Sequence, residues 1–291
     1  MLKCAVVGAT GAVGRQMLAD LEVGAATVEL QVDLFASPRS QGLKLLFQEK
    51  PPVLRVWDEG CLGKYDVVFM SAGSAFSRQW SPAIVQSGAW VIDNSSCWRL
   101  DAEVPLVAPE VNGEVLKAYT RPTIIANPNC STIQMVVALS PLQRSFGLQA
   151  VHVSTYQSVS GSGQTGVDAL QRELQDLDGT PSSPYPARIA HNLLPAIGAY
   201  EPGGACEEEA KMIAETRKIL ALPELDVLAS VVRVPVPHCH GETLWVRLAE
   251  PASYTEVTAA LAQGEGLQLY LGNQLDQEPL PLEWAGQPHV G

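Results

Sequence analysis

The sequence feature that most limits the fold is a glycine-rich turn close to the N-terminus. An apolar run at residues 3–7 leads into the heptapeptide GATGAVG at residues 8–14. Apolar residues follow it at helical spacing, so the turn joins a strand to a helix. Glycine lets the backbone approach a pyrophosphate, which the helix N-terminus then binds. This context predicts a dinucleotide-binding turn, although glycine-rich turns also serve as plain tight connections.

Further strands follow in the same half of the chain. Residues 28–36, 65–70 and 89–93 are short apolar runs, and a helix is expected at residues 74–86. Small polar residues follow the strands that end at Met70 and Asp93, as they do at the carboxyl edge of a doubly wound sheet. We therefore expect an α/β fold with a Rossmann-type doubly wound parallel sheet.

The second half of the chain carries a different pattern. Strands and helices are expected in the following ranges: 151–156, 167–177, 207–220, 227–236, 243–248 and 254–263. This arrangement predicts an α+β substrate domain, with a mixed or antiparallel sheet. We place an NADP-binding domain at residues 1–128 and a catalytic and dimerisation domain at residues 129–291.

The second predicted strand bears on the choice of coenzyme. An NAD enzyme usually ends this strand in an acidic residue that binds the ribose hydroxyls. Asp33 has about the right spacing, but apolar residues follow it, so we expect the strand to continue past it. The strand then leads to Arg39 and Ser40, which could bind a 2′-phosphate. This favours NADP, whereas a solvated arginine on a turn is the structural alternative.

A single thiol lies at another transition from strand to helix. Residues 123–126 read as a buried strand, Asn127-Pro128-Asn129 breaks it, and helical spacing begins after Cys130. Unpaired N–H groups and the helix dipole would stabilise a thiolate at this position and an oxyanion beside it. The structural alternative is an inert buried cysteine, because free cysteines are among the most buried residues.

Composition excludes several classes of protein. A net charge of −12 argues against a nucleic-acid partner, and no stretch is apolar enough for a membrane span. The six cysteines lack paired spacing, and the N-terminus does not resemble a signal peptide. We therefore expect a cytoplasmic protein with reduced thiols. His238-Cys239-His240 could suggest a metal site, but the two histidines would share one face of a strand without further ligand spacing, so we expect no metal.

Several motifs together resemble aspartate-semialdehyde dehydrogenase. Besides GATGAVG, they stand in that family's order, and they are DNSSCWR (93–99), VPLVAPEVN (104–112), NPNCSTIQMVVAL (127–139), STYQSVSGSG (154–163), EEEAKM (207–212) and RVPVPHCHGE (233–242). The resemblance runs to about residue 248. Family members continue past the final HVG with an arginine-containing strand and a long helix, so we expect this chain to lack that segment.

The resemblance also implies roles for individual residues. Cys130 matches the nucleophile, His240 the general acid and base, and Gln157 the residue that orients the substrate and acyl intermediate. The substrate-binding positions are Arg233 for the carboxylate, Glu208 for the amino group, and Arg99, Asn129 and Lys211 for phosphate. The cofactor-binding positions are Gly8, Thr10, Gly11, Ala12, Val13, Arg39, Ser40, Ser71, Gly73, Ser160 and Gly163.

The activity implied is reduction of L-aspartyl 4-phosphate by NADPH to L-aspartate 4-semialdehyde and inorganic phosphate. It proceeds through a cysteine thioester in the biosynthesis of lysine, threonine, methionine and diaminopimelate, by a homodimer. A thioester accepts hydride better than a carboxylate does, which explains a cysteine in this position. An alternative is the related reductase of N-acetyl-γ-glutamyl phosphate, although Glu208 argues against it because an acetylated amine carries no charge. A catalytically silent relative that acts as a binding protein is a second alternative. Glu208 and Lys211 could equally form a solvated helical ion pair.

Overall fold

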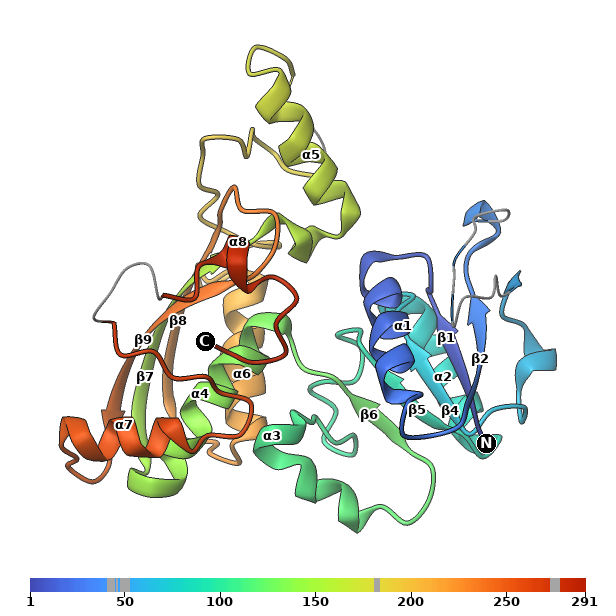
Figure 1. Ribbon diagram of the computed structural model, residues 1–291, viewed down its shortest axis with the longest axis horizontal. Helices are drawn as coiled ribbons and strands as arrows, with labels where there is room; N and C mark the ends of the chain where they lie inside the picture. Colours follow the sequence, from blue (N-terminus) through green and yellow to red (C-terminus); the bar gives the residue numbers. More distant parts are fainter. Residues whose placement is uncertain (41–44, 46, 48–52, 181–183, 273–277) are drawn as a thin grey trace. The chain divides into compact units, whose positions relative to one another are not determined.

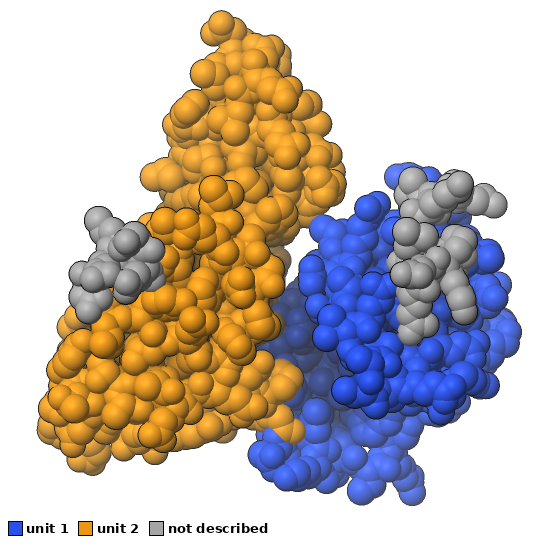
Figure 2. Space-filling model, viewed as in Figure 1, with its two compact units in different colours: residues 1–107, 114–128 blue, residues 108–113, 129–291 orange. Residues whose placement is uncertain are grey.

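The computed structural model describes residues 1–40, 45, 47, 53–180, 184–272 and 278–291 (Figure 1). The chain forms two compact units, which Figure 2 shows in separate colours. Unit 1 comprises residues 1–107 and 114–128, and unit 2 comprises residues 108–113 and 129–291. The domain boundary that we expected at residues 128 and 129 remains our proposal.

Unit 1 contains a sheet of six parallel strands. In chain order they are β1 (Leu2–Val7), β2 (Leu30–Phe35), β3 (Leu54–Arg55), β4 (Val67–Met70), β5 (Trp90–Asp93) and β6 (Ile124–Ala126). Their order in the sheet is β3-β2-β1-β4-β5-β6, which places β1 at the centre. The direction of the chain's progress across the sheet therefore reverses at β1, as in doubly wound nucleotide-binding folds. The predicted fold class is confirmed.

Helices α1 (Ala12–Gly24) and α2 (Ser74–Gln86) connect these strands (Figure 1). Leu18 of α1 packs against Val6 of β1 and Leu34 of β2 in a core that is closed to solvent. Burial on both faces explains why residues 4–7 of β1 form a continuous apolar run. Short 3₁₀ turns lie at Pro38–Ser40 and Glu59–Cys61.

Unit 2 contains a mixed sheet of three strands in the order β8-β7-β9. The central strand β7 (Leu148–Gln157) pairs in parallel with β8 (Asp226–Arg233) and antiparallel with β9 (Gly241–Leu248). The other elements of this unit are helices α3 (Pro109–Asn112), α4 (Cys130–Phe146), α5 (Gln164–Gln175), α6 (Glu207–Ile219), α7 (Tyr254–Ala262) and α8 (Pro281–Trp284), with a 3₁₀ turn at Val159–Ser162.

One face of this sheet is covered and the other is exposed. Met135 and Leu139 of α4 and Met212 of α6 pack against Val151 and Val153 of β7 to form the core. Alternate residues of β7 point away from this core, which gives the strand its alternating burial. The covered face anchors the two helices that carry the candidate site.

The sequence-based account of the segment before β9 was wrong in one respect. We expected a strand to run to residue 236 and to place His238 and His240 on one face. Strand β8 instead ends at Arg233, and residues 234–240 form a loop in which Cys239 has a φ of 68°. The loop directs His240 independently of His238, so strand periodicity does not apply to these histidines.

Candidate active site

The site in unit 2 is built around the start of α4. Asn129 is its N-cap, and its side-chain Oδ1 accepts the N–H groups of Ser131 and Thr132 at 2.9 and 3.2 Å. Cys130 is therefore the first helical residue, it is exposed, and it lies at the positive end of the helix dipole. These conditions favour the thiolate form of a cysteine.

Helix α6 holds Asn129 through two buried carboxylates. The side-chain Nδ2 of Asn129 donates to Glu208 Oε1 at 2.9 Å, and its main-chain N–H donates to Glu215 Oε2 at 2.6 Å. Glu208 Oε1 also accepts from Gln157 Nε2 at 3.3 Å. Negative charge near the N-terminus of a helix is favourable, so these carboxylates help to fix the position of α4.

Glu215 was missed by the sequence reasoning. It lies seven residues after Glu208 on α6, so the two side chains share one helix face. This spacing was the available signal, but acidic residues on a helix face are usually solvated. Only packing shows that Glu215 is 1% exposed and is bound to the residue before the cysteine.

His240 lies beside the cysteine although the two are 110 positions apart in the chain. Its Nε2 is 3.2 Å from Cys130 Sγ. Its Nδ1 accepts the main-chain N–H of Ser158 at 3.1 Å and lies 3.0 Å from Ser158 Oγ. Burial, with a smaller contribution from the Arg233 guanidinium, lowers the pKa of His240 to about 4. The imidazole is therefore uncharged at neutral pH.

Arg233 and the loop after β7 complete this arrangement. Arg233 is 5% exposed, and its Nη1 donates to the carbonyl oxygen of Ser158 at 2.8 Å. A Cβ added at Gly161 would lie 2.5 Å from Arg233 Nη1 and 3.4 Å from His240. Only glycine allows the loop to approach the arginine this closely, which explains part of the glycine content of the motif STYQSVSGSG.

Lys211 and Glu208 do not form the helical ion pair that was the structural alternative. Lys211 Nζ lies 2.6 Å from Glu207 Oε1, whereas Glu208 is buried against Asn129 and Gln157. The Lys211 ammonium lowers the pKa of Glu207. Gln157 is 1% exposed, and within the described part of the chain its Oε1 has no hydrogen-bond partner. Unpartnered buried acceptors of this kind are typical of functional sites.

The glycine-rich turn in unit 1 fits a dinucleotide. Gly8 has a φ of 89°, and a Cβ there would lie 2.3 Å from the carbonyl oxygen of Ser71, so the turn requires glycine. Gly11 caps α1 without a side-chain hydrogen bond, and a Cβ there would meet only the Gly8 carbonyl oxygen, at 3.4 Å. The first N–H groups of α1, which include those of Ala12 and Val13, are therefore open to an anion.

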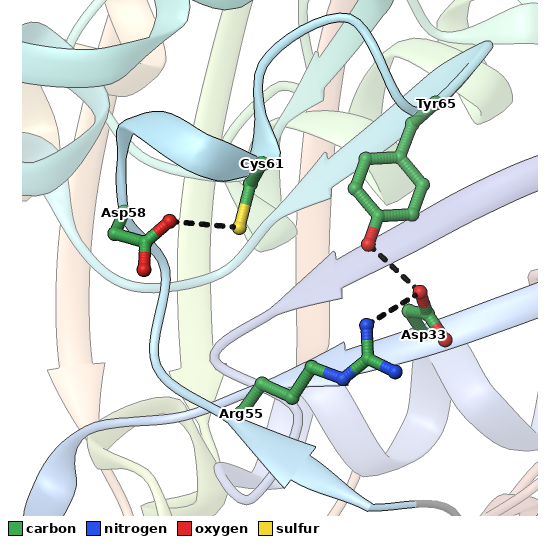
Figure 3. A network of polar contacts seen from close by, with 5 residues as sticks. All are labelled: Asp33, Arg55, Asp58, Cys61 and Tyr65. Carbon is green, nitrogen blue, oxygen red and sulfur yellow. Dashed lines mark hydrogen bonds and ion pairs between the residues drawn. The ribbon is translucent and has the colours of Figure 1, made fainter.

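Asp33 is engaged elsewhere and is not at the end of its strand. Strand β2 continues to Phe35, and Asp33 Oδ2 accepts from the Tyr65 hydroxyl at 2.8 Å and from Arg55 Nη1 at 3.3 Å (Figure 3). The same oxygen is held by both partners. The expected continuation of the strand past Asp33 is confirmed.

The residues expected to bind a 2′-phosphate lie after β2. Thr10 Oγ1 is 3.2 Å from Ser40 Oγ, and the exposed Arg39 lies in the same 3₁₀ turn as Ser40. Two hydroxyl groups and a guanidinium are suited to a phosphate. The turn therefore fits a phosphorylated ribose.

The remaining predicted residues fall in both units. Ser71 and Gly73 follow β4, and Gly73 caps α2 with a φ of 86°. Ser160 Oγ lies 3.0 Å from Ser158 Oγ, and Gly163 caps α5. Arg99 belongs to unit 1, where it donates to the carbonyl oxygens of Asn127 and Asn94. The roles assigned to all these residues remain predictions.

A doubly wound sheet joined to a unit in which a cysteine lies beside a histidine indicates a class, the dehydrogenases of the semialdehyde type. Comparison with known families agrees. Residues 3–119 match the model described as "Semialdehyde dehydrogenase, NAD binding domain". Residues 139–291 match "Semialdehyde dehydrogenase, dimerisation domain". The chain belongs to the aspartate-semialdehyde dehydrogenase family.

Individual relatives carry the same name. The aspartate-semialdehyde dehydrogenase of Aquifex aeolicus is 39% identical over 99% of this chain and 86% of its own length. That of Shewanella violacea is 40% identical over 92% of this chain and 80% of its own length. The crystal structure of aspartate semialdehyde dehydrogenase II from Vibrio cholerae, complexed with ASA, matches with a TM-score of 0.92 and 37% identity. It covers 99% of this chain and 85% of the Vibrio chain.

No described helix is long and apolar enough to cross a membrane.

Proposed function

We propose that the chain reduces L-aspartyl 4-phosphate with NADPH to L-aspartate 4-semialdehyde through a thioester on Cys130. The observation that supports this most directly is the 3.2 Å distance between Cys130 Sγ and His240 Nε2 at the start of α4. A thiol at the positive end of a helix dipole and a proton-transfer group then converge on one point. These are the parts that acyl transfer to sulfur requires.

The first chemical step is attack by the Cys130 thiolate on the acyl carbon. A carbon–sulfur bond forms, the carbon–oxygen bond to phosphate breaks, and phosphate leaves. The positive end of the α4 dipole stabilises the oxyanion beside Cys130. His240 forms hydrogen bonds with the oxygen atoms that gain negative charge, and it transfers protons to them. NADPH, when bound, supplies the hydride that reduces the thioester.

The side chains around Cys130 are suited to an amino-acid substrate. Arg233 can bind a carboxylate in a bidentate way, and Glu208 offers negative charge for an ammonium group. Glu208 also orders Gln157 and Asn129 through the hydrogen bonds described above. We assign phosphate binding to Lys211 and Arg99 together with Asn129. A charged amine fits beside Glu208, whereas an acetylated amine gains nothing there, which favours aspartyl phosphate over N-acetyl-γ-glutamyl phosphate.

We assign NADP as the cofactor. Asp33 Oδ2 is bound by Tyr65 and Arg55, and β2 runs past Asp33 to Phe35, so this carboxylate is not the acid at the strand end that usually binds the ribose hydroxyls of NAD. Thr10, Arg39 and Ser40 supply donors for a 2′-phosphate instead. A structural neighbour, the aspartate semialdehyde dehydrogenase of Candida albicans, was solved with NADP. It matches this chain with a TM-score of 0.69 and 28% identity, over 90% of this chain and 76% of its own.

We propose that the working form is a homodimer that pairs through the exposed face of the β8-β7-β9 sheet. Leu228, His152 and Trp245 stand opposite one another across the three strands. Leu228 is 57% and Trp245 59% exposed, and the Trp245 ring lies 5.5 Å from that of His152. An apolar row on an open sheet face is typical of a protein interface.

The test is phosphate-dependent reduction of NADP⁺ in the reverse direction. Wild-type protein should turn over L-aspartate 4-semialdehyde and should be inactive with N-acetyl-L-glutamate 5-semialdehyde. Cys130→Ala should abolish turnover and leave NADP⁺ binding, measured by calorimetry, largely intact. Turnover of the acetylated substrate alone would overturn the substrate assignment, and substantial turnover by Cys130→Ala would overturn the thioester.

A further inference from the structure

A carboxylate that is closed to solvent lies at the end of β5 in unit 1. Asp93 is the last residue of this strand and is 0% exposed. It accepts hydrogen bonds from Ser77 Oγ on α2 at 2.5 Å, and from both the main-chain N–H and the Oγ of Ser95 at 2.9 Å. Burial of a charged group is costly unless donors replace the water that it loses. The predicted cofactor contacts and the pair of Cys130 and His240 do not include Asp93, so its burial requires another explanation.

The Asp93 carboxylate holds the turn that follows β5 at two points. Ser95 is bound directly, and its Oγ also accepts the main-chain N–H of Cys97 at 3.2 Å. Trp98 is bound indirectly, because its Nε1 donates at 2.9 Å to Ser77 Oγ, the hydroxyl that donates to Asp93. Each hydroxyl gives its only hydrogen to the carboxylate and accepts an N–H of the turn. The conformation of the turn therefore depends on two acceptor oxygens at Asp93.

Arg99 closes the same turn. Its Nε donates to the carbonyl oxygen of Asn127 at 2.8 Å, and its Nη2 donates to the carbonyl oxygen of Asn94 at 3.0 Å. Asn127 Nδ2 donates to Asn94 Oδ1 at 2.8 Å, so the two residues that hold the guanidinium are themselves joined. Asn94 lies between Asp93 and Ser95 in the chain, so the bonds between these two residues fix its direction. Carbonyl oxygens carry no formal charge, so they orient the guanidinium and do not neutralise it.

We propose that Asp93 is a positioning residue: its carboxylate sets the conformation of residues 94–99, and this conformation orients the Arg99 guanidinium for the phosphate group of the substrate. The inference rests on the proposed function, which assigns phosphate binding to Arg99. In the reverse direction the same guanidinium binds inorganic phosphate. Loss of its orientation should therefore weaken phosphate binding and leave the binding of NADP⁺ largely unchanged.

Asp93→Asn is the test variant, because it keeps the size and shape of the side chain. One of the two acceptor oxygens becomes an NH₂ group, which cannot accept a hydrogen bond from a serine hydroxyl. Val68→Ala is the matched control. Val68 is 1% exposed on β4, the strand beside β5, so this variant weakens the same sheet through lost apolar contacts and leaves the polar contacts of the turn in place. Urea unfolding measures the stability that each variant loses.

The orientation of Arg99 can be followed by ¹⁵N NMR without any turnover. The Arg99 Nε–H signal is assigned by its loss in Arg99→Lys, and in wild type it should shift saturably when inorganic phosphate is added. Asp93→Asn should move the signal of the ligand-free protein and should need about tenfold more phosphate for the same shift. Val68→Ala should do neither. An unchanged signal and phosphate affinity in Asp93→Asn, or equal effects of the two variants, would overturn the proposal.

Steady-state kinetics in the reverse direction tests whether Asp93 acts through Arg99. In Asp93→Asn the KM for phosphate should rise about tenfold or more, and the KM for NADP⁺ should stay within about threefold of wild type. In an Arg99→Ala background, addition of Asp93→Asn should change the phosphate KM by less than about twofold, because the guanidinium to be positioned is gone. An equal rise in both backgrounds would show a general effect on unit 1 and would overturn the proposal.

The two measurements separate this inference from the proposed function. The NMR titration uses inorganic phosphate alone. If the chain fails to turn over aspartate semialdehyde while Asp93→Asn still weakens phosphate binding at Arg99, the proposed reaction fails and the positioning role stands. If turnover is normal and Asp93→Asn leaves the phosphate dependence unchanged, only the positioning role fails.

Discussion

Asn129 connects three parts of the candidate site through its own atoms. Its Oδ1 caps α4, its Nδ2 binds Glu208, and its main-chain N–H binds Glu215. The asparagine amide places an acceptor and a donor on separate atoms of one short side chain, so it can cap the helix and bind Glu208 at the same time. The position of Cys130 therefore depends on the residue before it as much as on the helix that follows.

Glu242 is a residue whose charge opposes folding at high pH. Burial raises its pKa to about 8, against the lowering effect of a hydrogen bond from Gln134. Within the described residues its Oε1 has no hydrogen-bond partner. Because the folded-state pKa is raised above the unfolded value of 4.5, the native protein binds the proton more tightly.

This gives a prediction for Glu242→Gln. The protonated Glu242 carboxyl favours the folded state over the unfolded state. This contribution to stability is complete below pH 4.5 and is lost as the pH rises through the folded-state pKa of about 8. At one pKa unit per 1.36 kcal/mol, the loss amounts to about 5 kcal/mol at most. Urea unfolding should show Glu242→Gln gaining stability over wild type between pH 5 and 9. A constant difference across that range would contradict the assigned titration.

At the level of elements, the chain uses similar junctions in both units. Helix α1 begins after a glycine turn and helix α4 after an asparagine cap, and both follow strands. Each presents the positive end of its dipole at its first turn; the Asn129 side chain caps α4, whereas α1 has no side-chain cap. We propose that the first binds a pyrophosphate and the second stabilises a thiolate and an oxyanion, so the same helix property serves both ligands.

Substitution of the glycines in the first turn tests which of them the fold requires. Gly8→Ala combines a positive φ with a Cβ placed 2.3 Å from the Ser71 carbonyl oxygen, so β1 and β4 would have to move apart. We expect a loss of about 3 kcal/mol or more in urea unfolding. Gly11→Ala is the matched control, because its φ of −71° suits alanine and its closest contact would be 3.4 Å. Equal stability of the two variants would contradict the role of the Gly8 contact.

In the whole molecule, the proposed functions of cofactor binding and catalysis belong to different units. Unit 1 contains the predicted dinucleotide turn, and unit 2 contains the cysteine, the histidine and the open sheet face. The small sheet is covered on one side by α4 and α6, and its other side is exposed. Assembly and catalysis are therefore predicted to use opposite faces of the same three strands.

The predicted assembly can be tested by placing charges in the apolar row. The double variant Leu228→Arg and Trp245→Arg should weaken a dimer by about 100-fold or more, because it buries two like charges on each side of the two-fold axis. Sedimentation velocity measures the effect. Val23→Arg, at a 77% exposed position of α1, is the control for an added arginine elsewhere. A monomeric wild type, or a double variant that remains dimeric, would refute this interface.

The regular elements were largely predictable from local patterns. The expected helix at residues 74–86 matches α2, and the expected strand at residues 28–36 contains β2. These predictions succeed because apolar spacing and glycine act through neighbouring residues. The error at residues 234–240 arose because the short apolar and proline-containing run after Arg233 resembles a strand, whereas no strand pairing extends there.

The sequence by itself determined the position of the glycine turn, because this depends on a short continuous stretch of chain, and it determined the fold class through the succession of such stretches. The choice of Cys130 over an inert buried cysteine came from the whole set of motifs that carry the family resemblance. The tertiary structure decided which groups that cysteine meets. The partners of His240 and Asn129 come from residues 82 to 110 and 79 to 86 positions away, respectively. Asp33 likewise meets Tyr65 only through the packing of β2 beside neighbouring segments. Hydrogen-bond direction and burial depend on where distant elements pack, so they cannot be predicted from the spacing of residues along the chain.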